Sequence, residues 1–204
     1  MLEKAVPRIV DADQRRRELT EAVWRVIRRD GVAAASVRAV AREAGTSMGA
    51  LRHWFGTQDE LLHFAMTLVM ERARTRAEAA AAAGGPLVPR LLRVLEETLP
   101  LDEERRAETE VWLALTARAL VDPQLAGLRD RSSAELHAFC VDVVRVLVAE
   151  GAARPDLDVD LEGERLYAVL DGLAVHAVTR PSVLPPDRVR EVLATHLAAL
   201  GATR

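Results

Sequence analysis

The chain has 204 residues, of which half are apolar but only 3% are aromatic, and its net charge at neutral pH is −3. This length permits one large or two small domains with a buried core, and the abundance of alanine, leucine, valine, arginine and glutamate favours helices. The single cysteine, Cys140, excludes an internal disulfide, and the absence of a long apolar run or of a signal-peptide core predicts a cytoplasmic, soluble protein.

Residues 1–12 show no clear period, and we expect them to form a flexible arm. From Asp13, apolar residues recur with the spacing of a helix that has one buried face, and Gly31 ends this helix. The apolar stripe consists of Leu19, Ala22, Val23, Val26 and Ile27.

Three further helices are predicted within residues 36–83. Ser36 and Ser47 are suitable N-cap residues for two short helices that Gly45 separates. Thr57 begins a longer helix, and Glu60 three residues later completes a capping-box pattern. Two short helices joined by a glycine turn are typical of a helix-turn-helix, whose second helix can enter the major groove of DNA.

The strongest break in the chain is Gly84-Gly85-Pro86. Beyond it, apolar spacing and proline or glycine breaks predict helices at 87–98, 103–121, 123–150, 161–180 and 185–201, and no strand. We therefore predict an all-α protein in which an N-terminal three-helix helix-turn-helix DNA-binding domain precedes an all-helical ligand-binding and dimerisation domain. The predicted parts are an arm at 1–12, the DNA-binding domain at 13–60, a connecting helix and linker at 61–86, and the regulatory domain at 87–204.

The predicted DNA-binding domain carries the more positive charge. Residues 1–60 contain 11 lysines and arginines against 9 acidic residues, whereas residues 61–204 contain 17 against 22. Small residues at the start of the second short helix would let the backbone approach DNA and would present amides to phosphate. Arg52 could contact a guanine or a phosphate, and Trp54 could pack inward or donate its indole N–H to the DNA backbone. The predicted DNA contacts are Ser36, Arg38, Ser47, Met48, Gly49, Ala50, Arg52, His53, Trp54 and Gln58.

Residues 36–62, SVRAVAREAGTSMGALRHWFGTQDELL, resemble the DNA-binding signature of the TetR family of bacterial regulators, and the resemblance extends from Asp13 to about Met70. It implies a regulator, expected to be a repressor, that binds a palindromic operator as a homodimer and is released by a small, mainly apolar effector. Arg52 and Trp54 stand where the family commonly has tyrosine, and the change at Arg52 implies a different operator. Gln58 replaces a common phosphate-facing lysine, which puts one backbone contact in doubt.

The second half, over about residues 87–200, more loosely resembles the branch of choline-responsive repressors, for example in LPLDEERRAETEVWLAL at 99–115. This resemblance implies a ligand-responsive domain that dimerises through its last two helices. It does not imply choline, because quaternary ammonium sites need an aromatic cage and this half has few aromatic residues: Trp112, Phe139 and Tyr167.

Two sets of residues in the second half are candidates for function. The first occupies apolar helix faces that would surround a central cavity, although each member could equally be ordinary core: Trp112, Thr116, Phe139, Cys140, Leu170, Asp171 and His176. Within it, Asp171 would need a ligand or a partner, and it could instead pair with an arginine at a dimer seam. The second forms one stripe on the last helix, with more apolar surface than docking on its own core requires, and is the predicted dimer interface: Val189, Val192, Leu193, His196, Leu197 and Leu200.

Other functions have weaker support. His137 and Cys140 lie three residues apart but have no second pair of metal ligands with matching spacing. Asp156, Asp158 and Asp160 imitate the start of a calcium loop without its glycine and glutamate, so a turn that caps the next helix is the better interpretation. Since no catalytic motif is present, we expect neither an enzyme nor a cofactor. The competing hypotheses are a helical protein-interaction module and an activator of the same architecture.

Overall fold

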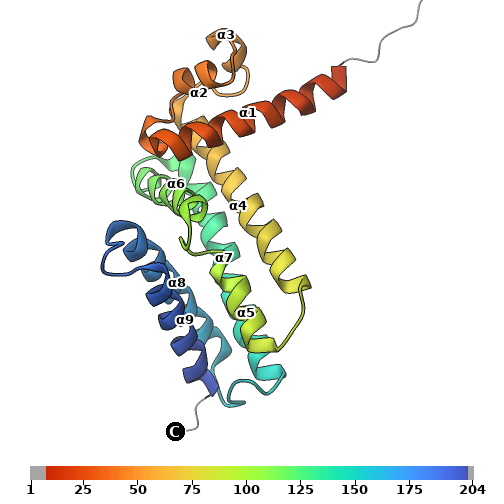
Figure 1. The fold of residues 1–204 in the computed structure, drawn as a ribbon, viewed down its shortest axis with the longest axis vertical. Helices are drawn as coiled ribbons and strands as arrows, with labels where there is room; N and C mark the ends of the chain where they lie inside the picture. The colour runs from red at the N-terminus through yellow and green to blue at the C-terminus, as the bar shows by residue number, and fades with distance from the viewer. Residues whose placement is uncertain (1–7, 202–204) are drawn as a thin grey trace, which may run out of the picture. The chain divides into compact units, whose positions relative to one another are not determined.

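The computed structural model of the protein describes the backbone of residues 8–201, and the side chains of residues 14–201 apart from residue 16. Within this range the chain consists of helices joined by turns, without a strand (Figure 1). The helices are α1 (Arg8–Asp30), the 3-10 helix η1 (Val32–Ala34), α2 (Val37–Glu43), α3 (Met48–Leu51), α4 (Gln58–Ala82), α5 (Leu87–Glu96), α6 (Glu103–Ala119), α7 (Pro123–Ala149), α8 (Val159–Thr179) and α9 (Pro186–Gly201).

The predicted helices are present, with corrections at the N-terminal end. From α5 onward each helix begins and ends within two residues of its predicted bounds. In contrast, α1 begins at Arg8, so the predicted arm at 1–12 is too long, and its residues 1–7 lie outside the described part. The short η1 was not predicted, and α3 is a single turn that ends at Leu51.

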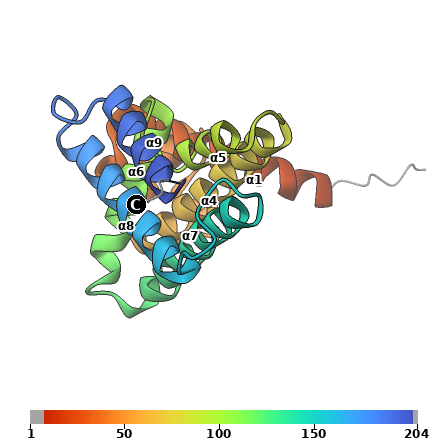
Figure 2. The ribbon, with the colours of Figure 1, turned by 90° about the horizontal axis from the view of Figure 1, so that it is seen from below.

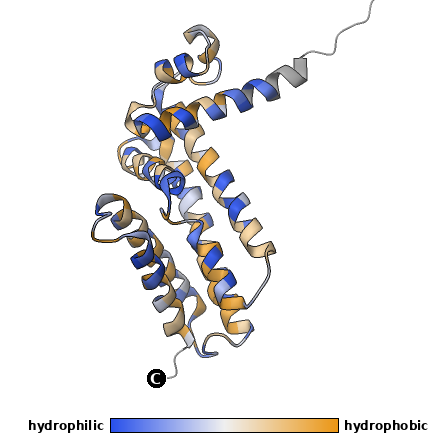
Figure 3. Cartoon of the chain, viewed as in Figure 1, coloured by the Kyte–Doolittle hydropathy of each residue, from blue (hydrophilic) through white to orange (hydrophobic). Residues whose placement is uncertain are grey.

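The chain divides into two compact units, residues 1–68 and 69–204, and the boundary falls within α4. In both units the helices alternate between hydrophilic and hydrophobic residues along their length, as expected for helices with one buried face (Figure 3). In the first unit, α2 packs on α1, and α3 packs on α2. All five residues of the apolar stripe predicted for α1 are buried: Leu19, Ala22, Val23, Val26 and Ile27.

An ion-pair cluster joins α2 to α1. Glu43, at the end of α2, accepts a hydrogen bond at Oε1 from Nε of Arg25 and another at Oε2 from Nη1 of Arg29, each at 2.8 Å. Arg29 also contacts Asp30 at 2.8 Å. These hydrogen bonds, first the one from Arg25, lower the pKa of Glu43. The two arginines on successive turns of α1 thus fix the C-terminal end of α2 by charge-assisted hydrogen bonds.

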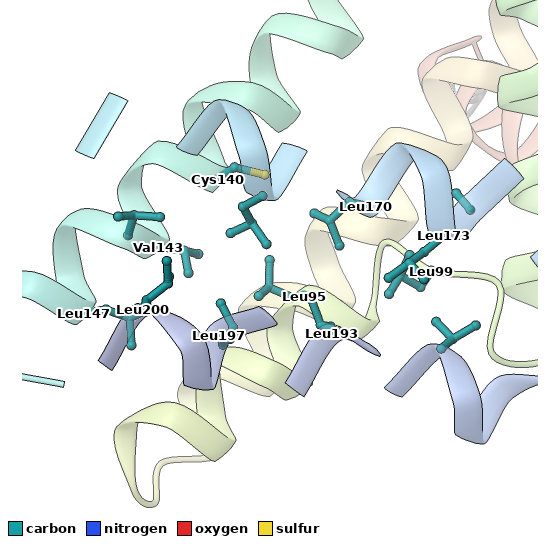
Figure 4. Packing of buried hydrophobic residues seen from close by; sticks show 14 of the residues in the cluster. Leu95, Leu99, Cys140, Val143, Leu147, Leu170, Leu173, Leu193, Leu197 and Leu200 are labelled. Atoms are coloured by element: carbon teal, nitrogen blue, oxygen red, sulfur yellow. The ribbon is translucent and has the colours of Figure 1, made fainter. Parts of the chain in front are cut away.

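In the second unit, α5, α7, α8 and α9 lie side by side, as both ribbon views show (Figures 1 and 2). Their inward side chains form one apolar core (Figure 4). The helices α7 and α8 approach very closely at Gly163, where an added Cβ would lie 2.8 Å from the Cα of Val141. Glycine is therefore required at this position by the packing of the two helices.

The predicted dimer stripe on α9 belongs largely to this core. Val189 and Leu193 are completely buried within the chain, and Leu197 and Leu200 are each 4% exposed. Figure 4 shows Leu193 and Leu197 beside Leu95 of α5. The prediction that these four residues form a dimer surface is wrong, because they have almost no accessible area left to bury against a second chain. The other two members of the stripe, Val192 and His196, are half-buried.

A second ion cluster lies inside the second unit, where Arg76 of α4 meets α6 and the end of α5. The guanidinium of Arg76 donates to both carboxylate oxygens of Glu108, at 2.9 and 2.5 Å, and to Glu97 at 2.9 Å. The Glu108 side chain is only 6% exposed. Burial raises the pKa of Glu108, and the bond and charge of Arg76 oppose that rise.

Candidate nucleic-acid interface

A serine caps the start of each of α2 and α3, and a glycine lies in the turn between the two helices. The Oγ of Ser36 accepts the N–H of Ala39 at 3.2 Å, and the Oγ of Ser47 accepts the N–H of Ala50 at 3.1 Å. Between the helices, Gly45 has φ of 60°, in the left-handed region that favours glycine. Both predicted N-caps are confirmed, and the two helices with this short turn form a helix-turn-helix.

The α3 segment divides its side chains between core and solvent. Leu51 and Phe55 are buried at 0% and 2% exposure, and Phe55 packs on Phe64 with ring centroids 4.9 Å apart. The exposed set on the other side coincides with residues predicted to contact DNA: Met48, Gly49, Ala50, Arg52, His53 and Trp54. The segment therefore presents a continuous exposed surface while its apolar residues anchor it to the first unit.

Gly49 is not needed for the fold. Its backbone is helical, and an added Cβ would meet only the Oγ of Ser47, at 3.9 Å. This open space in front of the backbone is what close approach of a DNA strand would require.

Two predictions for this segment concern Trp54 and the helix amides. Trp54 is 38% exposed, so part of its side chain is covered by the protein and part is accessible to a DNA strand. Of the amides expected to bind phosphate at the start of the helix, one is used by the cap. The amide of Ala50 is already bonded to Ser47, and a four-residue helix aligns too few peptide dipoles to attract an anion strongly.

Gln58 has a structural role that was not predicted. Its side-chain Nε2 donates to the backbone carbonyl of Ala35 at 2.5 Å. This bond uses one of the two N–H donors of the amide, and since Gln58 is exposed, its contact with DNA through the second donor stays a prediction. Next to it, the predicted cap at Thr57 is confirmed, since Thr57 Oγ1 accepts the N–H of Glu60 at 3.1 Å. The return bond of the predicted capping box is shifted by one residue, because the Glu60 carboxylate accepts the N–H of Gly56 instead of that of Thr57.

Two residues of the helix-turn-helix region, one exposed and one structural, were missed in the sequence interpretation. Arg42 is exposed and lies four residues after Arg38, so both arginines project from one face of α2. That spacing was visible in the sequence. Arg15 of α1 donates to the Oγ1 of Thr46 at 2.5 Å and so holds the turn before α3. This contact spans 31 residues, and no local pattern indicates it.

The candidate ligand residues of the second unit are only partly brought together. Cys140 and Leu170 lie fully within the core, and Trp112 and Phe139 are partly buried against it. The Oγ1 of Thr116 is buried and has no hydrogen-bond partner among the described residues. His176 is exposed, so its predicted place in an internal cavity is wrong.

Asp171 is half-buried at the side of α8. The hydroxyl of Tyr167 interacts with both Asp171 and Ser133, and burial raises the pKa of the Asp171 carboxyl. Burial likewise raises the pKa of Cys140 to about 12, so the thiol is neutral. Asp158 caps α8 by accepting the N–H of Leu161 at 3.1 Å, which confirms the capping turn predicted there.

Among residues whose positions are described, no cluster of three or more histidine, cysteine, aspartate or glutamate side chains is suited to hold a metal ion. In the same part of the chain, every helix is too short or too polar to cross a membrane.

The fold and the exposed α3 surface define a helix-turn-helix protein, and comparison with known proteins gives its family. Residues 19–64 match the bacterial regulatory proteins of the tetR family, and residues 88–202 match the C-terminal domain of BetI-type transcriptional repressors. The chain belongs to the TetR family of transcriptional regulators.

Similar proteins cover nearly the whole chain. The HTH-type transcriptional regulator PksA of Bacillus subtilis is 38% identical over 96% of this chain and 94% of its own length. A BetI regulator of Stenotrophomonas maltophilia is 29% identical over 78% of this chain and 79% of its own. Among solved structures, one from Saccharomonospora viridis in complex with choline is 25% identical with a TM-score of 0.82, and covers 95% of this chain and 100% of that chain.

Proposed function

We propose that this regulator is a repressor that binds a palindromic operator as a homodimer in the cytoplasm, and that a small, mainly apolar effector binding to the second unit releases it. The observation that carries the proposal is the surface of α3 and the turn after it. Gly49, Arg52 and His53 are exposed there, while Leu51 and Phe55 are buried and fix the segment to the first unit. The match of the second unit to BetI-type repressors supports repression over activation.

The proposed dimer surface is the outer face of α8 and α9. After the correction for the buried α9 stripe, the residues left at this face are small or half-buried, and they would allow two helix pairs to approach closely. They include Ala168, Gly172, Val192, Thr195 and Ala199. Gly172 is the most informative, because an added Cβ there would meet no atom of this chain within 4 Å.

The oligomeric state tests this surface. Gly172→Arg should leave the helical content unchanged, since the chain itself leaves space there, but should give monomers in sedimentation experiments. Ala82→Arg, on an exposed position at the end of α4, is the control and should remain dimeric. A dimeric Gly172→Arg protein would place the interface elsewhere.

The proposed effector contacts are Trp112, Thr116, Phe139 and Asp171. Thr116 has an unpartnered hydroxyl and Asp171 a half-buried carboxylate, which offer polar contacts, and the partly buried Trp112 and Phe139 offer aromatic surface. A small-molecule site usually combines these two kinds of contact. The choline-bound structure from Saccharomonospora viridis supports binding of a small organic molecule by a protein of this fold.

Selection of bound fragments from random duplex DNA tests the DNA-binding function. We expect enrichment of a sequence with two inverted half-sites whose centres are about one helical turn apart or a multiple of it. No enrichment even at low salt would favour the protein-interaction alternative. Placing the selected site in a reporter promoter then separates the two kinds of regulator, because a repressor lowers transcription and an activator raises it.

A further inference from the structure

Met48 is an exposed apolar side chain in a place where a DNA-binding surface is usually polar. It is the first residue of α3 and is 37% exposed. In the described part of the first unit, the only other large apolar side chain with comparable exposure is Trp54, which lies beyond the end of α3. The neighbours Gly49 and Ala50 are small and exposed, so they leave the Met48 side chain unobstructed.

The position of Met48 restricts what it can meet on DNA. In helix-turn-helix proteins the first residues of the second helix contact base edges in the major groove. A thioether side chain gives neither a strong donor nor a strong acceptor to a base. The major-groove edges present one apolar group, the C5-methyl of thymine.

We propose that Met48 selects thymine at one position of each operator half-site through contact with the C5-methyl group. The proposal rests on the DNA-binding function above and names the base chemistry that this surface recognises. Arg52, one turn further on and also exposed, would then contact a different base or a phosphate.

Deoxyuridine gives a direct test, because it lacks only the C5-methyl of thymine and keeps its hydrogen-bonding edge. The probe is the selected operator, with each thymine replaced in turn in both half-sites. Burial of one methyl group changes an affinity about fourfold, so two symmetric contacts should change it roughly 15-fold. We expect one symmetric pair of positions to show this loss with the unaltered protein.

Variants of Met48 assign the effect to this side chain. Met48→Ala should bind thymine and deoxyuridine operators equally, whereas Met48→Leu, which keeps an apolar side chain, should retain the difference. Met48→Gln should shift the preferred base at that position to adenine, since glutamine can bond both N6 and N7 of adenine. Arg52→Ala is the matched control in the same segment: it should weaken binding but keep the ratio between the two operators.

Two results would overturn the proposal: no deoxyuridine-sensitive position, or a Met48→Ala variant that keeps the sensitivity of the unaltered protein. Both results require that the protein binds its selected operator. They are therefore distinct from failure of the proposed function, in which no operator is selected. Circular dichroism of each variant checks that the exposed substitution leaves the helices intact.

Discussion

Replacement of Arg76 by methionine would remove the hydrogen bonds that Arg76 gives to a buried carboxylate inside the second unit, that of Glu108. Methionine keeps much of the length of the arginine side chain but none of its donors. Both oxygens of Glu108 would lose their hydrogen bond to Arg76, and the Glu108 side chain is only 6% exposed, so it has little access to water. Glu97, at 20% exposure, would lose one bond but keep access to water and to Arg105.

The expected loss of folding stability depends mainly on Glu108, because it is more deeply buried than Glu97. Removing one partner of a buried ion pair typically costs about 3–5 kcal/mol, and the partial exposure of Arg76, at 29%, argues for the lower end, about 3 kcal/mol. For a protein of this size, such a loss lowers the Tm by roughly 6–12 °C.

The loss should also depend on pH. Burial already raises the pKa of Glu108 in the folded protein, and removal of Arg76 leaves only the weaker charge effect of Arg72 to oppose this rise. A raised carboxyl pKa means that the folded state holds its proton to higher pH than the unfolded state, so stability falls as the pH rises through that window. The deficit of Arg76→Met should therefore be largest at pH 7.5 and smaller at pH 5.

Thermal unfolding followed by circular dichroism at these two pH values is the assay. Arg74→Met is a control on the same helix, because Arg74 and its partner Glu135 are 62% and 52% exposed, and exposed pairs contribute about 0–1 kcal/mol. Equal Tm values for the two variants at pH 7.5, or a deficit of Arg76→Met that does not shrink at pH 5, would refute the reasoning.

Three further predictions concern single side chains. Gly49→Glu should abolish operator binding in a gel-shift assay while circular dichroism stays unchanged, because the position is open in the protein but faces the proposed DNA; retained binding would remove Gly49 from the interface. Glu43→Ala should weaken operator binding and lower the Tm, since Arg25 and Arg29 would no longer hold α2; an unchanged Tm would contradict this. Burial and then the charge of Arg165 lower the pKa of His196, so the unfolded state takes up the proton first. Stability should decrease as the pH falls below about 6.5, and His196→Leu should show a smaller decrease between pH 7.5 and 5.5.

Local patterns predicted the helices well because their signals lie within a few residues. The caps at Ser36, Ser47, Thr57 and Asp158 each bond an amide two to four residues away, and the structure shows each of these bonds. Local patterns did not show how short α3 is. It is a single helical turn that a non-helical turn follows, and this arrangement has nearly the same apolar spacing as a longer helix. Leu51 and Phe55 are buried, whereas Trp54 between them is 38% exposed.

The sequence could not show what each apolar face packs against. The stripe on α9 is strongly apolar whether it faces α5 and α8 of its own chain or a second chain, and only the tertiary structure distinguishes the two. A similar ambiguity affected Gln58, whose amide could donate to a phosphate or to a carbonyl of its own chain. Its partner Ala35 lies 23 residues away, beyond the reach of any local pattern.

The hydrogen bonds at the start of α4 also bear on how the first unit can open. Gln58 is bonded to Ala35, which precedes α2, and Glu60 is bonded to Gly56, which follows the α3 segment. Local unfolding of α2 and α3 would have to break these side-chain bonds as well, so this region should open together with the first turn of α4 as one cooperative segment. Amide hydrogens in α2 and at the start of α4 should then exchange with a common opening free energy. An effector that unfolded α3 alone would also have to break these hydrogen bonds. The coupling therefore favours DNA release by displacement of an intact helix-turn-helix.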